Sequence, residues 1–272
     1  MTVVYAATIA GSDPSGGAGV QVDLRTFAAA GTWGLSVITA LTAQTPSAVR
    51  AVEPVSPRMI ASQWEALLEA FPIGAAKTGM LATADACRAV ADAVPPDLPL
   101  VVDPVMVATS GGRLLEESAI EALMTRLLPR ATLLTPNLAE AEALTGRTVR
   151  TMEEMLLAAE ALRSLGAAAV LVKGGHAEGE KAVDLLVDAE GAVPFSARRL
   201  PFDVHGSGCC LSAAITARLA QGAPLRDAVG FGKFVVSAAI AGAVTAPDGR
   251  RMANPRPVQP QVCGCFPPPG AP

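Results

Sequence analysis

The residues best suited to chemistry form the segment Gly206-Ser207-Gly208-Cys209, which precedes a run of small residues that predicts a helix. A Gly-x-Gly turn at a helix start leaves backbone N–H groups unpaired, and with the helix dipole these donors form an anion site. The same field favours the thiolate form of Cys209. An anion cradle beside a proton acceptor suits phosphoryl transfer to an alcohol, although a glycine turn with a buried structural cysteine gives the same local pattern.

A second candidate site is the glycine-rich segment 11–19, which follows an apolar strand and leads into a helix. Four glycines in nine residues let the backbone turn tightly and approach a ligand closely. The segment lacks the Gly-Lys-Ser/Thr ending of a P-loop and the spacing of a dinucleotide fingerprint. We therefore expect a ligand loop of another type, with Asp23 one helical turn beyond it and facing the same crevice.

Polar residues also follow the ends of several expected strands. The amide of Gln44 can pair with the edge of a heteroaromatic base, although taken alone it is better interpreted as a loop glutamine. Asp103 ends a strand, where an acid commonly holds Mg²⁺. Asn137 and Glu140 share one face of a first helical turn, where the helix dipole by itself also favours a carboxylate. Lys173, followed by two glycines, can reach a phosphate as a point charge.

The elements that position these residues alternate between short apolar strands and alanine-rich helices. Repeated β-α-β units of this kind predict an α/β fold with a mostly parallel sheet, helices on both faces and ligands beyond the carboxyl ends of the strands. The expected strands are 3–10, 34–42, 75–78, 100–103, 131–135, 168–173, 182–188 and 193–199, the last two as a hairpin or paired edge strands. The expected helices are 19–30, 57–71, 83–94, 116–128, 138–145, 152–165, 208–221 and 225–244.

Composition and charge bound the possible functions. The 272 residues are enough for one large α/β domain, which we place at residues 1–246, followed by a Pro-rich tail at 247–272 that is a loop or disordered. The net charge of −4 argues against a nucleic-acid partner. No apolar run reaches membrane-spanning length and the N-terminus lacks a signal pattern, so a cytoplasmic location is expected, with the five cysteines reduced.

Seven segments in order give the chain a family resemblance. Together they resemble the hydroxymethylpyrimidine/phosphomethylpyrimidine kinases of thiamine biosynthesis, within the ribokinase-like superfamily, over about residues 3–245. The segments are 10–21, 39–44, 77–81, 103–112, 135–140, 172–176 and 205–209. The resemblance implies a three-layer αβα sandwich, ATP as phosphoryl donor, Mg²⁺ and a homodimer. It also implies that an aminopyrimidine alcohol is phosphorylated first, and its monophosphate then to the diphosphate.

The resemblance also implies a role for each candidate residue. Residues expected to line the pyrimidine pocket are Gly11, Ala18, Asp23, Gln44, Met80 and Val107. Gly206, Ser207 and Gly208 match the anion hole. Cys209 matches the base, which is aspartate in most ribokinase-like kinases, and we expect helix end and nearby cations to lower its pKa. Residues expected to contact nucleotide or phosphate are Asn137, Lys173 and Lys233, and those expected at the metal are Asp103 and Glu140.

The sequence departs from the family pattern in three places. Val204 and Ser207 stand where threonine is usual, and the chain end lacks the usual Gly/His-rich finish, so adenine contacts are not assigned. Pyridoxal kinase is the main alternative, but its look-alikes often carry a further cysteine where this chain has Val107-Ala108-Thr109. A non-catalytic ligand-sensing descendant would be expected to lose the base or the anion turn, and both are present.

Overall fold

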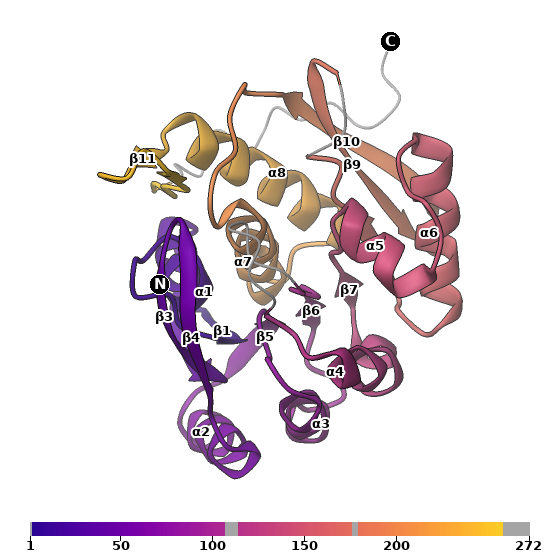
Figure 1. Cartoon of the computed structure of the whole chain (residues 1–272). Coiled ribbons are helices and arrows are strands. Elements are labelled where there is room, and N and C mark those ends of the chain that lie inside the picture. Colours follow the sequence, from indigo (N-terminus) through magenta and orange to yellow (C-terminus); the bar gives the residue numbers. More distant parts are fainter. Residues whose placement is uncertain (1, 107–113, 176–178, 258–272) are drawn as a thin grey trace.

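An eight-stranded sheet forms the centre of the computed structural model, which describes residues 2–106, 114–175 and 179–257 (Figure 1). Its strands, in spatial order, are β10 (Gly191–Arg198), β9 (Lys181–Asp188), β8 (Val170–Val172), β7 (Leu133–Leu134), β6 (Leu100–Val102), β5 (Ile73–Thr78), β1 (Tyr5–Ala10) and β2 (Trp33–Ile38). The strands from β8 to β2 are parallel, while β9 and β10 add an antiparallel edge. The mostly parallel sheet is therefore confirmed.

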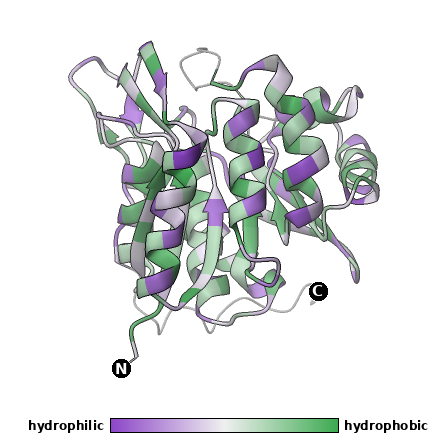
Figure 2. Cartoon of the chain, turned by 90° about the horizontal axis from the view of Figure 1, so that it is seen from below, coloured by the Kyte–Doolittle hydropathy of each residue, from purple (hydrophilic) through white to green (hydrophobic). Residues whose placement is uncertain are grey.

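Helices cover both faces of this sheet, which makes the fold a three-layer αβα sandwich. One face carries α1 (Gly19–Ala29), α7 (Ser207–Ala220) and α8 (Leu225–Ala241). The other face carries α2 (Pro57–Ala70), α3 (Ala84–Ala93), α4 (Glu117–Ala122), α5 (Leu138–Thr145) and α6 (Met152–Ser164). Apolar colour follows the strands and the inward helix faces in Figure 2, as expected for a sheet covered on both sides. Among the described residues, no helix has both the length and the apolar character needed to cross a membrane.

Local capping explains where several helices begin. The Ser56 hydroxyl accepts a hydrogen bond from the Met59 amide at the start of α2, where proline occupies the first turn. Asn137 and Glu140 form a reciprocal capping box at α5, and Thr151 and Glu154 do the same at α6. The expected helix over 116–128 begins as α4 but continues as a π turn over Leu123–Leu127 and a 3₁₀ turn over Leu128–Arg130.

The strand expected over 34–42 is wrong in one respect, because the chain leaves the central sheet at Thr39. Strand β2 ends at Ile38, and β3 (Ala40–Thr45) pairs antiparallel with β4 (Ala48–Pro54) in a separate two-stranded sheet. At the break, the Thr39 amide donates to the Ala10 carbonyl and its hydroxyl donates to the Met80 carbonyl at 2.6 Å. This departure carries Gln44 away from the central sheet and to the rim of the site.

The expected end of ordered structure at residue 246 needs correction for residues 251–254. Strand β12 (Arg251–Met252) pairs with β11 (Val244–Thr245), and Ala253 is buried. The His205 amide donates to the Arg251 carbonyl at 2.8 Å, and the Ala253 amide donates to the His205 carbonyl at 3.0 Å. This segment is held by backbone hydrogen bonds and not by a periodic row of apolar side chains. Its sequence therefore contains no apolar periodicity that would predict it.

Candidate active site

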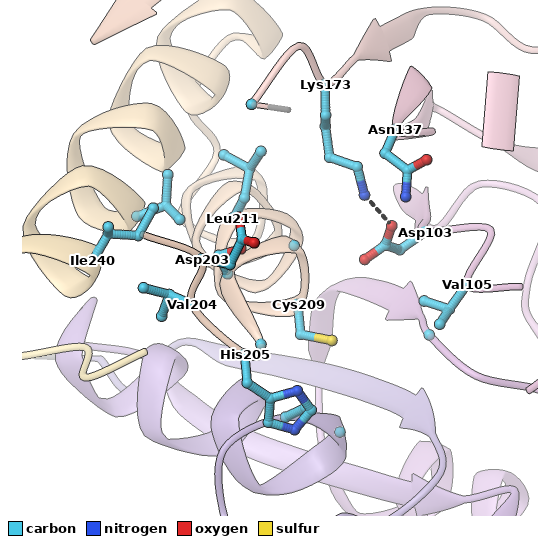
Figure 3. Close-up of a pocket in the computed structure, with 18 of the residues that line it drawn as sticks. Asp103, Val105, Asn137, Lys173, Asp203, Val204, His205, Cys209, Leu211 and Ile240 are labelled. Atoms are coloured by element: carbon cyan, nitrogen blue, oxygen red, sulfur yellow. Dashed lines mark hydrogen bonds and ion pairs between the residues drawn. The ribbon is translucent and has the colours of Figure 1, made fainter. Parts of the chain in front are cut away.

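A cavity of about 260 Å³ lies at the carboxyl ends of the parallel strands (Figure 3). One side is formed by the glycine loop 11–19 and β3, and the other by β9, β10 and α8. The candidate residues that the structure brings together in its lining are Gly11, Ala18, Gln44, Met80, Asp103, Asn137, Glu140, Lys173, Gly206, Ser207, Gly208, Cys209 and Lys233. Val107 lies outside the described residues, and Asp23 is absent from the lining. Residues that we expected to contact the acceptor and residues that we expected to contact the nucleotide thus line the same cavity.

The Gly206-Ser207-Gly208 segment, which we call the anion turn after its expected role, has the local backbone that the sequence indicates. Gly206 has a left-handed backbone, with φ 78°, and no side chain caps the start of α7. A Cβ atom at Gly206 would collide with the carbonyl oxygen of Gly17, so glycine is required for close approach of the two loops. The helix start has no side-chain cap and lines the cavity, and the one N–H of the turn with a recorded partner, that of Ser207, makes only a long bond of 3.4 Å to the Val204 carbonyl, so the turn can bind an anion.

A cluster of opposite charges lies beside this turn. The Lys173 ammonium contacts Asp103 Oδ1 at 2.7 Å and Glu140 Oε2 at 3.8 Å, and the first contact is drawn in Figure 3. The Ser212 hydroxyl, from the second turn of α7, donates to Asp103 Oδ2 at 3.1 Å. Burial acts to raise the pKa of Asp103, but Lys173 and Lys77 outweigh it and hold that pKa below its ordinary value. Asp103 therefore stays ionised and holds the ammonium in place.

Glu140 caps a helix and is also a buried carboxyl group, and the sequence does not show this burial. Its Oε2 accepts a hydrogen bond from the backbone N–H of Asn137 at 2.8 Å. The side-chain Oδ1 of Asn137 accepts one from the backbone N–H of Glu140 at the same distance. Burial raises the pKa of Glu140 to about 7, because Lys173 only partly offsets the desolvation and Asp103 adds repulsion. Glu140 is thus a helix cap and also a carboxyl whose charge is sensitive to pH near neutrality.

Cys209 follows the turn, and its side chain is among those that line the cavity (Figure 3). Burial raises the pKa of its thiol to about 12, and the nearby Lys77 ammonium offsets only part of this rise. The expectation that the helix end and neighbouring cations lower this pKa is therefore wrong for the protein without ligands. Desolvation of the thiolate exceeds the favourable local field.

Asp23 does not face the crevice, contrary to the expectation from its position one turn into α1. Its carboxylate is fully buried and accepts two hydrogen bonds from the Lys77 ammonium, each 2.9 Å, and one from the Thr8 hydroxyl at 2.6 Å. Burial opposes the charge on Lys77, but Asp23, Cys209 and Asp103 together raise its pKa. Asp23 therefore acts behind the cavity wall, where it holds Lys77 charged.

Lys233 lies in the lining but is paired with a residue that sequence reasoning missed. Its ammonium contacts Asp184 Oδ2 at 2.7 Å, and Asp184 Oδ1 accepts from the Gly174 amide at 3.0 Å. The cavity also has an apolar wall that includes Leu211, Val236 and Ile240. These side chains come from inward faces of α7 and α8, so only the helical periodicity there could have suggested them.

The fold and the site define a ribokinase-like small-molecule kinase: an αβα sandwich with an anion turn at a helix start, at the carboxyl ends of a parallel sheet. The sequence model of the phosphomethylpyrimidine kinase family matches residues 13–254. The chain belongs to this family.

Individual relatives agree with this assignment. The hydroxymethylpyrimidine/phosphomethylpyrimidine kinase of Rhizobium meliloti (strain 1021) is 48% identical over 246 residues, which cover 89% of this chain and 92% of the relative. The phosphomethylpyrimidine kinase structure from Clostridium difficile 630 has a TM-score of 0.77 at 41% identity, covering 87% of this chain and 99% of that one. An ADP complex of Bacillus subtilis pyridoxal kinase has a TM-score of 0.86 at 36% identity, covering 93% and 97%.

Proposed function

We propose that this chain transfers the γ-phosphoryl group of ATP to the hydroxymethyl oxygen of 4-amino-5-hydroxymethyl-2-methylpyrimidine. It then phosphorylates the monophosphate to the diphosphate, in thiamine biosynthesis. The observation that carries the proposal is that the uncapped start of α7 lies in one cavity between the glycine loop and the wall formed by β9, β10 and α8. Phosphoryl transfer depends mainly on such alignment and on neutralising charge.

Each part of the lining has a proposed task. The N–H groups of residues 206–208 bind the oxygens of the transferring group, and Lys173 contacts phosphate once it exchanges its carboxylate partners. Gln44 and Met80, with the glycine loop, hold the pyrimidine. Cys209 accepts the proton of the attacking hydroxyl. Lys233 and Asn137 belong to the nucleotide side.

The carboxylates suit Mg²⁺ held largely by the nucleotide. Asp103 and Glu140 converge on the Lys173 ammonium, which occupies the place of a cation between them. Among the residues that the structure describes, no group of three His, Cys, Asp or Glu side chains could hold a metal. One or two carboxylates with phosphate oxygens and water make a usual Mg²⁺ site. When bound, the ion would neutralise phosphate charge.

Substrate identity is tested by offering two alcohols to the purified protein. ATP with Mg²⁺ is supplied with either the aminopyrimidine alcohol or pyridoxal, and ADP and phosphorylated products are measured by liquid chromatography with mass spectrometry. We expect a higher kcat/KM for the pyrimidine, with monophosphate appearing before diphosphate. A higher kcat/KM for pyridoxal would favour the alternative kinase, which the likeness to the Bacillus subtilis pyridoxal kinase makes the second candidate.

Catalysis by a contaminant is excluded with a matched pair of cysteine variants. Cys210 is fully buried in α7 next to Cys209 and does not line the cavity. Cys209→Ala should lose most turnover, whereas Cys210→Ala should keep it. We also propose a homodimer and a cytoplasmic location, and sedimentation analysis of the purified chain tests the first.

A further inference from the structure

Asp13 and His205 connect two loops that are far apart in the sequence. His205 Nε2 lies 3.0 Å from Asp13 Oδ2, and both side chains are more than nine-tenths buried. Asp13 belongs to the glycine loop, and His205 directly precedes the anion turn. This contact therefore joins the acceptor side of the cavity to the group that binds the transferring phosphate.

Asp13 also shapes the glycine loop itself. Its Oδ1 accepts from the amide and the hydroxyl of Ser15, at 2.9 and 2.7 Å, and its Oδ2 accepts from the Ala18 amide at 2.8 Å. Burial acts to raise the pKa of Asp13, but hydrogen bonds from His205 and Ser15 outweigh it and lower the pKa to about 2. The carboxylate is therefore ionised, and Nε2 is the ring nitrogen that carries a proton toward it.

The backbones of the two loops interlock around this contact. A Cβ atom at Gly17 would lie 2.8 Å from His205 Cδ2, and one at Gly206 would strike the Gly17 carbonyl oxygen. The backbone of His205 is held in turn by Arg251 and Ala253. The backbone of His205 is thus held in place, and its ring makes one hydrogen bond, to Asp13 in the glycine loop. The orientation of the ring therefore sets the position of the glycine loop relative to the anion turn.

We infer that His205 is a positioning residue for the proposed phosphoryl transfer: its Nε2–H bond to Asp13 holds the glycine loop, and with it the acceptor, in line with the anion turn. The inference rests on the proposed function. His205 Nδ1 is buried and has no partner among the described atoms, so a direct contact from Nδ1 to substrate is the competing role. Figure 3 shows the ring beneath Cys209.

Two substitutions separate these roles. His205→Gln places an amide N–H at about the reach of Nε2 and keeps the bond to Asp13, whereas His205→Asn places an amide near Nδ1 and loses that bond. Misplacing reacting groups by about 1 Å costs on the order of 10²-fold in rate. We expect His205→Asn to lower kcat by roughly 10²-fold and to raise the KM for the alcohol, with nucleotide affinity nearly unchanged, and His205→Gln to restore most of kcat.

A matched control removes a hydrogen bond far from the cavity. Thr132 Oγ1 accepts from the Leu100 amide at 3.1 Å, at the opposite end of the sheet, and Thr132→Val should change the melting temperature without changing kcat or KM. Rescue by asparagine and not by glutamine would overturn the inference in favour of a contact from Nδ1. Full activity of both variants would overturn it as well.

A readout without turnover separates this inference from the proposed reaction. Amide hydrogen exchange should be faster in His205→Asn than in the wild type and His205→Gln at the hydrogen-bonded amides of the two loops, which are those of Ser15, Gly16, Ala18, residue 205 and Ala253. Unchanged exchange in His205→Asn would contradict the loop coupling even if the enzyme were active. Failure of the wild type to phosphorylate the pyrimidine, with exchange as expected, would instead reject the substrate assignment and leave the coupling standing.

Discussion

Replacement of Cys209 by aspartate should change how the rate depends on pH. Burial raises the pKa of the thiol to about 12 from an ordinary value of 9.0. At pH 7 the thiolate fraction is then on the order of 10⁻⁵, and it rises about tenfold with each pH unit up to the pKa. If proton transfer needs the thiolate, kcat of the wild type should rise steeply between pH 7 and 9. The ordinary pKa of aspartate is about 5 units below that of a thiol, so in the same buried environment Cys209→Asp should ionise at a much lower pH and give a flatter profile than the wild type.

The assay is steady-state ADP release at saturating ATP, Mg²⁺ and pyrimidine alcohol, from pH 6 to 9.5. Cys209→Ala sets the rate without a base, expected ~10²–10⁴-fold below the wild type at pH 8. Cys210→Ala controls for loss of a neighbouring thiol, because burial also raises the pKa of Cys210, to about 11, but its side chain lies in the α7 core. A flat wild-type profile together with near-normal turnover in Cys209→Ala would refute the assignment of Cys209 as base.

Three further predictions concern binding and stability. Gln44→Ala should weaken binding of the pyrimidine by about 1–3 kcal/mol and leave ATP affinity unchanged in calorimetric titrations, because a pocket amide loses its partner; equal losses would place Gln44 outside the pyrimidine site. The folded-state pKa of Glu140, about 7, exceeds its ordinary 4.5, so the folded chain binds this proton more tightly and stability falls as pH rises between those values. Glu140→Gln keeps the cap acceptor and should raise the melting temperature at pH 8 but not at pH 4. A chain ending at residue 246 should melt several degrees below one ending at residue 257, because it loses the bonds to His205; equal melting temperatures would show that residues 251–254 add nothing.

The sequence predicted the parts of the site whose position depends on where a strand ends. Asp103, Asn137 and Lys173 follow neighbouring parallel strands, so the topology brings them to one edge without detailed packing. The anion turn was predictable for a similar reason, since two glycines at the start of a helix, Gly206 as the cap and Gly208 in the first turn, define the local backbone. Helix α5 begins and ends where expected because Asn137 caps one end and Gly146, in a left-handed conformation, follows the other.

Burial and partners distant in the sequence were not predictable. Asp23 turns away from the crevice because Lys77 lies beside it, 54 residues further along the chain. The pKa of Cys209 depends on how completely the surrounding elements exclude water, which local sequence does not encode. The separation of β3 from β2 depends on hydrogen bonds from Thr39 to Ala10 and Met80, which exist only once three elements have met.

The lysines of the cavity lining are paired with aspartates, and this arrangement bears on the proposed reaction. Each of the three lysines in the lining contacts an aspartate: Lys77 with Asp23, Lys173 with Asp103 and Lys233 with Asp184. An unpaired buried ammonium would be costly before any ligand arrives, and pairing with a carboxylate offsets part of that cost. The pairs are not equivalent, because Asp23 gives Lys77 two contacts and Thr8 fixes the carboxylate, so this lysine is held away from ligands.

Lys173 differs in having two carboxylates within reach and a position 3.4 Å from where a Cβ of Gly208 would stand. A phosphate bound at the anion turn therefore arrives next to an ammonium that can exchange one anionic partner for another. The exchange releases Asp103 and Glu140 together, which are the two carboxylates proposed for Mg²⁺. In the proposed reaction, one movement of Lys173 toward phosphate thus both neutralises the incoming charge and frees the cation ligands, so the site is assembled by the nucleotide that it binds.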